Sequence, residues 1–144
     1  MRGSLKIALS VLAIFFVVLY CGLQYFKMEF ADSSDYTETD RLEYYFYTPK
    51  LLKSMPRISN NYSFHYSNVS GPNPTLIYQV NFVGTADISK IEKYLEKNGY
   101  KKDEQCSFSQ GCWVRSEPNI TVTIEIEDNP VTVHIEMVDN QESH

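Results

Sequence analysis

The sequence predicts an α+β protein in which an N-terminal transmembrane helix precedes a small antiparallel sheet with one helix packed on its apolar face. The 144-residue chain begins with an uncharged apolar run. Several later segments alternate apolar and polar residues, as antiparallel strands with one solvated face do. A segment between them has the apolar spacing of an amphipathic helix. After the membrane segment we therefore expect the order β-β-α-β-β-β.

The first element is an apolar segment from Ile7 to Leu23 without a charged residue. As a helix it would span about 26 Å, and extension to residue 26 gives residues 7–26 the full length of a bilayer core. Arg2 and Lys6 precede the segment, and acidic residues follow Lys27. The positive-inside rule thus predicts a single-pass protein of the inner or plasma membrane with a cytoplasmic N-terminus. Its remainder would be extracytoplasmic, in the periplasm if the source is bacterial.

Two other interpretations of this segment stay open, and both fit the residues less well. A cleaved signal peptide needs small residues at positions −3 and −1 of the cut, but cleavage after Gly22 places Tyr20 at −3. A lipoprotein needs a small residue before Cys21, where Tyr20 also stands. The residues therefore favour an uncleaved signal anchor.

Charge divides the chain into two parts. Residues 1–27 have a net charge of +3, whereas residues 28–144 contain 10 Lys and Arg against 18 Asp and Glu, a net charge of −8. We expect a cytoplasmic tip and anchor over 1–27, an acidic linker over 28–40 and an extracytoplasmic domain over 41–144. The excess of negative charge opposes binding to nucleic acid.

The first half of the domain is expected to contain a hairpin. Residues 41–47 are ambiguous between helix and strand, and Thr48 with Pro49 predicts the start of a short helix that ends by Met55. Residues 61–69 and 75–83 alternate on either side of a Gly- and Pro-containing turn. This pattern predicts two paired strands.

The second half is expected to hold the main helix and a second hairpin. Asp87 can cap a helix within 84–99, and Asn98 with Gly99 supplies its C-terminal cap. A short strand is expected over 112–114, and longer ones over 119–127 and 131–138. The apolar positions are even-numbered in residues 119–127 and odd-numbered in residues 131–137. Since apolar residues must lie opposite apolar ones, the two position numbers of each pair sum to an odd value.

This parity rule leaves two registers for the second hairpin. Ile126 opposite Val131 satisfies the rule and is the register we expect. A shift by two residues also satisfies it and would place Glu125 opposite His134.

Two cysteines of the domain, Cys106 and Cys112, enclose five residues. In an exported domain this spacing predicts a disulfide, and a metal site is disfavoured because a second ligand pair is missing. Three sequons begin at Asn61, Asn68 and Asn119, which would be glycosylated only in a eukaryotic source. The sequence leaves the kingdom open.

No set of residues predicts catalysis or a cofactor. His65 shares a strand face with Ser63 and Ser67, whose side chains project in parallel, and no third member of a triad is evident. His134 lacks a second nearby histidine with which to bind a metal. We therefore expect a protein that is not an enzyme and that needs no cofactor or metal.

Two groups of side chains are candidates for contact with a protein partner. Alternating carboxylates form part of a polar sheet face, and a dense run of tyrosines is typical of interfaces. These candidate contact residues are Tyr44, Tyr45, Tyr47, Glu125, Glu127 and Glu136.

The function that we expect is that of a membrane-anchored protein-binding module with a basic protein partner. It would act as an immunity or inhibitor protein does, or as an accessory subunit of an envelope complex. The alternatives are a structural envelope protein without catalytic activity and a small hydrolase that uses His65 or a glutamate pair.

Overall fold

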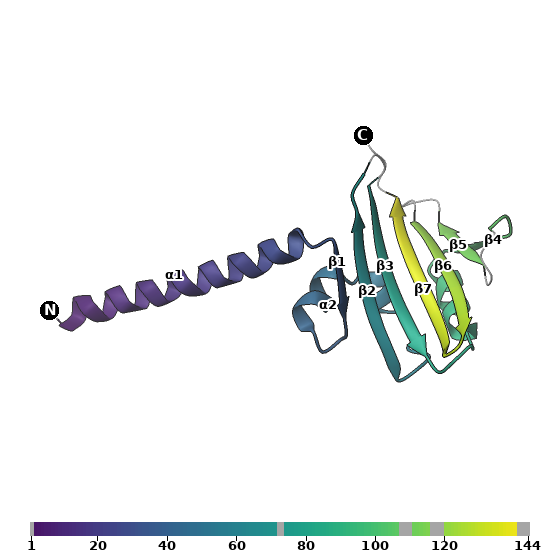
Figure 1. Ribbon diagram of the computed structural model, residues 1–144, viewed down its shortest axis with the longest axis horizontal. Coiled ribbons are helices and arrows are strands. Elements are labelled where there is room, and N and C mark those ends of the chain that lie inside the picture. The colour runs from purple at the N-terminus through teal and green to yellow at the C-terminus, as the bar shows by residue number, and fades with distance from the viewer. Residues whose placement is uncertain (1, 72–73, 107–110, 116–119, 141–144) are drawn as a thin grey trace. The chain divides into compact units, whose positions relative to one another are not determined.

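Figure 1 shows the computed structural model of the chain, which describes residues 2–71, 74–106, 111–115 and 120–140. The chain divides into two compact units, Met1–Ala31 and Asp32–His144. The first unit is a single helix, α1 (Arg2–Glu29). Its residues Lys6–Glu29 are long and apolar enough to cross a membrane.

The second unit is built on a seven-stranded antiparallel sheet in the order β1-β2-β3-β7-β6-β5-β4 (Figure 1). The strands are β1 (Ser33–Tyr36), β2 (Asn61–Val69), β3 (Thr75–Val83), β4 (Lys101–Asp103), β5 (Cys112–Arg115), β6 (Ile120–Asp128) and β7 (Val131–Asn140). The helices are α2 (Arg41–Tyr47), α3 (Lys50–Lys53) and α4 (Ser89–Lys97). An α+β fold with an apolar N-terminal helix is therefore confirmed.

The first hairpin has the expected bounds, and β7 lies between its second strand and β6 (Figure 1). The two edge strands were not expected. β1 forms from residues assigned to the acidic linker, so the expected linker over 28–40 is wrong at 33–36. There Tyr36 is buried and its ring stacks on Phe64, with 5.6 Å between ring centroids. This buried ring packs β1 against the core. The linker was expected from the acidic composition of the segment, which does not show that one of its residues is buried.

The register of the second hairpin differs from the one we expected. Asp128 pairs with Val131, Ile126 with Val133, and Glu125 with His134. The pairing of Ile126 with Val131 is therefore wrong, and the shift by two residues is correct. The reason is a tighter turn, in which only Asn129 and Pro130 separate the paired residues, so the ladder extends further toward the turn.

One face of the sheet forms the core. Its central row joins Phe64, Val80, Ile135 and Ile124 across four adjacent strands, and all four are fully buried. The helices also contribute fully buried side chains, Leu52 from α3 and Ile91 and Leu95 from α4.

The aromatic segment over 41–47 is helical and splits between core and surface. Tyr47 is buried and its ring stacks on Tyr66, with 4.4 Å between ring centroids. Tyr44 meets Phe64 edge to face, whereas Tyr45 is 80% exposed. The contacts of Tyr44 and Tyr47 place α2 on the core side of the sheet.

The helix termini only partly follow the sequence signals. Thr48 does not cap α3; its hydroxyl donates to the hydroxyl of buried Tyr36 (3.1 Å). The Asp87 carboxylate accepts the backbone N–H of Ser89 at the start of α4 (3.0 Å). At the end of α4, Gly99 has a φ of +83°, and the N–H of Tyr100 donates to Leu95 O at 3.0 Å. This is the expected glycine-terminated cap.

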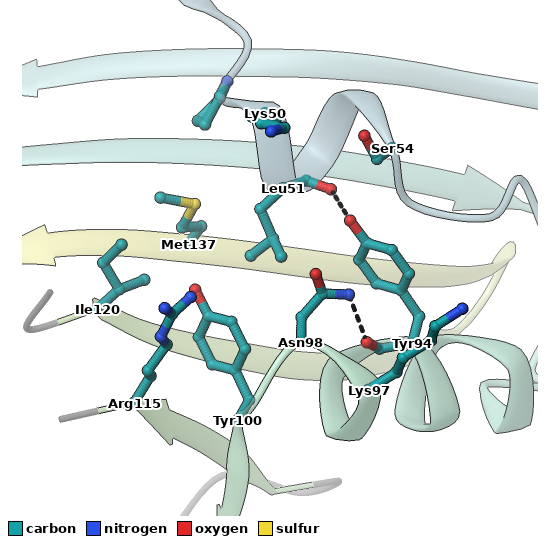
Figure 2. Close-up of a pocket in the computed structure, with 11 residues that line it drawn as sticks. Lys50, Leu51, Ser54, Tyr94, Lys97, Asn98, Tyr100, Arg115, Ile120 and Met137 are labelled. Atoms are coloured by element: carbon teal, nitrogen blue, oxygen red, sulfur yellow. Dashed lines mark hydrogen bonds between the residues drawn. The ribbon is translucent and has the colours of Figure 1, made fainter. Parts of the chain in front are cut away.

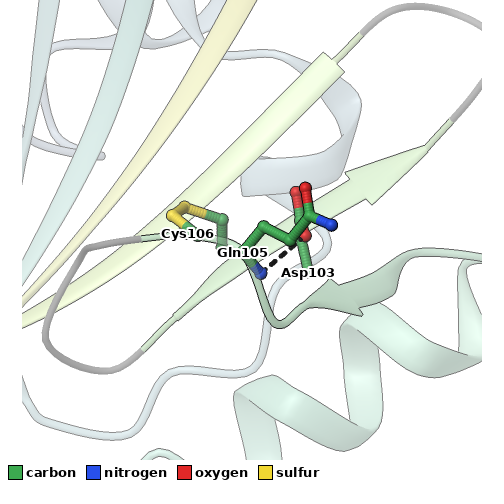
Figure 3. The surroundings of a disulfide bond; sticks show 4 residues. Asp103, Gln105 and Cys106 are labelled. Atoms are coloured by element: carbon green, nitrogen blue, oxygen red, sulfur yellow. Dashed lines mark hydrogen bonds between the residues drawn. A yellow bond between two sulfur atoms is a disulfide. The ribbon is translucent and has the colours of Figure 1, made fainter.

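The disulfide between Cys106 and Cys112 is present, as expected (Figure 3). The two Cα atoms are 5.8 Å apart, within the usual range for a disulfide. The Asp103 carboxylate accepts the N–H of Gln105 (3.0 Å) and so shapes the turn that leads into Cys106. The bridge joins this turn to the buried first residue of β5.

Candidate functional site

The sheet face opposite the core is polar across five adjacent strands. One row of paired residues runs from Asp35 through His65, Gln79 and Glu136 to Thr123. A neighbouring row runs from Ser63 through Asn81 and His134 to Glu125. We call these nine residues, together with Glu127, the acidic face.

Part of the acidic face is hollowed into an open depression of about 430 Å³. It brings together the three glutamates that the sequence predicted as partner contacts and adds polar residues from β3, β6 and β7. The polar residues that line it are Gln79, Thr123, Glu125, Glu127, His134 and Glu136.

The two histidines of this face are held by neighbouring side chains. Nδ1 of His65 lies 2.7 Å from Oδ1 of Asp35. Nδ1 of His134 lies 2.7 Å from Oδ1 of Asn81, and its Nε2 lies 3.3 Å from Oε2 of Glu127. Both rings are therefore held in place by neighbouring side chains.

Glu136 is a partly buried carboxylate of the acidic face. Its partial burial raises its pKa above the ordinary value, and the negative charge of Glu125 raises it further, against the opposite effect of His65. Burial disfavours the charged form because water solvates it less well. A cation placed in the depression would remove this penalty.

Charge is sharply divided within the domain. The strands β1, β2, β3, β6 and β7 contain no Lys or Arg. They contain six carboxylates, on Asp35, Glu125, Glu127, Asp128, Glu136 and Asp139. The basic residues after Lys27 lie on α2, α3, α4, β4, β5 and the loop before β2. The five strands therefore offer negative charge without a Lys or Arg of their own.

The structure does not bring the predicted tyrosines to the acidic face. Tyr44, Tyr45 and Tyr47 belong to α2, which packs on the core side of the sheet. Tyr45 is exposed and Tyr44 is half-buried. The prediction that Tyr47 contacts a partner does not fit its position in the core. The two groups of candidate residues thus lie on opposite sides of the sheet.

Nothing in the described part of the chain assembles a metal or triad-type centre. Within those residues, no group of three or more His, Cys, Asp and Glu side chains could hold a metal ion. His65 is paired with Asp35, and in the same residues no serine hydroxyl is hydrogen-bonded to it. The carboxylate and amide oxygen atoms of the acidic face can accept hydrogen bonds.

Comparison with known proteins finds no matching family model, no matching curated protein and no matching solved structure.

Sequence reasoning missed three members of the site: Asp35, Gln79 and Asn81. Asp35 stood in the presumed linker, and the other two are neutral residues of a strand whose neighbour β7 follows some fifty residues later. The alternation within residues 75–83 was the available signal, since it places both side chains on the polar side of the strand.

Proposed function

We propose that this chain is a single-pass membrane protein whose extracytoplasmic domain binds a cationic segment of a protein partner through the acidic face. The observation that carries the proposal is the absence of Lys and Arg from five adjacent strands whose acidic face holds four carboxylates, on Asp35, Glu125, Glu127 and Glu136. Lys or Arg side chains of a partner would supply the missing positive charge. The domain would then act by contact, as an immunity or inhibitor protein or as an accessory subunit of an envelope complex.

Electrostatics gives this proposal its physical basis. A surface of one sign steers an oppositely charged partner and raises the association rate. At the half-buried Glu136, a partner cation would also relieve the cost of a poorly solvated carboxylate. Anchoring through α1 would confine the domain to the membrane surface and raise its effective concentration there.

The proposed orientation rests on the basic flank before the membrane segment and on the disulfide. Disulfides persist in oxidising compartments, which agrees with an exported domain. A reporter fused after His144 should therefore be active as an exported reporter. Activity of such fusions only in the cytoplasm would contradict the orientation.

Photo-crosslinking in native membranes tests the binding proposal. A photoreactive residue replaces Gln79 in the depression, and a control places it at the exposed Lys90 of α4. We expect a protein adduct from position 79 and none from position 90. The adduct should disappear in the double variant Glu125→Lys, Glu136→Lys. It should weaken at about 0.5 M salt, where the Debye screening length falls to about 4 Å.

The alternative of a structural envelope protein predicts no dependence of the adduct on salt. If the adduct from position 79 survives both charge reversal and high salt, the acidic face does not bind by charge and the proposal fails.

A further inference from the structure

A second cavity lies on the core side of the sheet, between α3, α4 and the strands β5 to β7 (Figure 2). Its volume is about 620 Å³, which falls within the range of small-molecule sites. On β7 the consecutive residues Glu136 and Met137 line the depression and this cavity, respectively. The cavity is therefore separate from the acidic face and independent of the function proposed for it.

Three basic side chains border the cavity from three different elements. Lys50 comes from α3, Lys97 from α4 and Arg115 from β5 (Figure 2). Its lining within the described residues contains no Asp or Glu. None of the four ion pairs in the described part of the chain involves these three residues. In a domain with an excess of acidic residues, the lining of this cavity is therefore locally basic.

The remaining lining combines an apolar surface with fixed aromatic rings. Leu51, Ile120 and Met137 supply the apolar side chains (Figure 2). The Tyr94 hydroxyl donates to Leu51 O at 2.8 Å and so ties α4 to α3. Tyr100 is 4% exposed, and the guanidinium carbon of Arg115 lies 5.9 Å from the centre of its ring. The two rings are thus positioned by contacts within the protein.

We propose that this cavity binds a small organic anion that joins a carboxylate to an apolar, aromatic body. The carboxylate would lie at the rim of the cavity, which Lys50, Lys97 and Arg115 border and where their nitrogen atoms are hydrogen-bond donors only. The apolar body would cover Leu51, Ile120 and Met137 and contact the rings of Tyr94 and Tyr100. The cavity needs both parts of the ligand, because neither its charge nor its apolar surface is satisfied by a simple ion.

The lysines of α4 differ in their position relative to the cavity. Of the three lysines of α4, only Lys97 borders the cavity. Lys93 lies one turn earlier and is exposed outside the lining. The pair Lys97 and Lys93 therefore provides a matched test and control on one helix.

The experiment titrates the full chain in lipid nanodiscs with three probes and follows the methyl resonance of Met137 by NMR. The probes are 3-phenylpropionate, its uncharged analogue 3-phenylpropionamide, and inorganic phosphate. We expect saturable binding of the carboxylate and binding about tenfold weaker for the amide, the size of one charge-assisted contact. Phosphate should not shift the Met137 methyl or displace the carboxylate at equal concentration.

Substitutions of single basic residues test which of them contribute to binding of the carboxylate. Lys97→Gln and Arg115→Gln should each weaken 3-phenylpropionate binding by about three- to tenfold. Lys93→Gln should bind as the parent chain does. Unchanged thermal unfolding of the variants shows that the fold is retained.

Three outcomes would overturn the proposal. Equal affinity for carboxylate and amide would show that the cavity does not select an anion. Full displacement by phosphate would show a site for simple inorganic ions. Equal effects of Lys97→Gln and Lys93→Gln would show attraction by overall charge in place of a defined site.

Discussion

Nδ1 of His65 lies 2.7 Å from Oδ1 of Asp35, a residue thirty positions earlier in the chain. The two are directly paired across β1 and β2, so this contact fastens the edge strand to the sheet on its solvated side. The Asp35 side chain is 86% exposed, and exposed ion pairs stabilise proteins by about 1 kcal/mol at most.

We therefore predict that His65→Ala lowers the free energy of unfolding by no more than about 1 kcal/mol. Because His65 does not line the depression, the variant should also leave partner crosslinking from position 79 intact. Urea unfolding and the crosslinking assay check the two parts. Loss of function with fold and partner binding preserved would instead reveal a catalytic site at the first hairpin.

Glu136→Gln should stabilise the free domain while it weakens partner binding. Because the pKa of Glu136 is raised in the folded state, its ionisation destabilises that state once the pH rises through the raised value. Near pH 7 we expect a gain of about 0.5 kcal/mol in the free energy of unfolding, the size of a cross-strand repulsion. Below the unfolded-state pKa, near pH 3.5, the gain should vanish because the carboxyl is neutral in both states.

The matched control for this prediction is Glu96→Gln, which removes an exposed carboxylate on α4. It should change neither stability nor crosslinking. If Glu136→Gln destabilises the domain near pH 7, the carboxylate has a favourable partner within the protein and is not held for a ligand.

Two tyrosines of α2 should respond in opposite ways to substitution by alanine. Tyr47 is buried against Tyr66, so Tyr47→Ala should lower the free energy of unfolding by about 3 to 5 kcal/mol. Tyr45 is 80% exposed, and Tyr45→Ala should change it by about 0.5 kcal/mol or less. Chemical denaturation of the two variants measures the contrast. A large loss of stability in Tyr45→Ala would show that its ring is not free for a partner.

Removal of the disulfide should destabilise the domain moderately. Closure of so short a loop restricts the unfolded chain by about 2 kcal/mol, so Cys106→Ala should lower the free energy of unfolding by that amount. A reductant should lower the stability of the parent chain but not that of the variant. Intact mass of the exported parent without a deficit of two hydrogens would count against the bridge.

Tyr36 should make the domain sensitive to alkali. Burial raises its pKa to about 12, although the hydrogen bond from Thr48 acts to lower it. An unfolded tyrosine ionises near pH 10. The contribution of Tyr36 to the free energy of unfolding is therefore complete below pH 10 and is lost as the pH rises to about 12. The loss should reach about 2 to 3 kcal/mol. Tyr36→Phe should flatten this part of the stability profile, whereas Tyr45→Phe, at an exposed ring, should leave it unchanged.

The alternation of apolar and polar residues was enough to predict β2 and β3 to the residue and to locate β6 and β7. Such patterns are local, because each residue's environment follows from its neighbours two positions away. The glycine cap after α4 was predictable for the same reason: Gly99 itself supplies the positive φ that ends the helix. Local signals also sufficed for the disulfide, whose two cysteines lie six residues apart.

The edge strands gave no such signal. β1 has four residues and β4 has three, too few for a period of two to stand out from chance. Asp35 therefore appeared to belong to a linker, and its pairing with His65 could not be foreseen.

By itself the sequence determined the apolar N-terminal helix, the polar side of each long strand and the glutamates of the acidic face. Only the tertiary structure decided that β7 lies between β3 and β6, that Glu125 is opposite His134, and that Lys50, Lys97 and Arg115 border one cavity. The physical reason is that a shift of two residues, or an exchange of neighbouring strands, keeps every side chain on its own face. The choice among such arrangements depends on turn geometry and long-range packing, which no local pattern records.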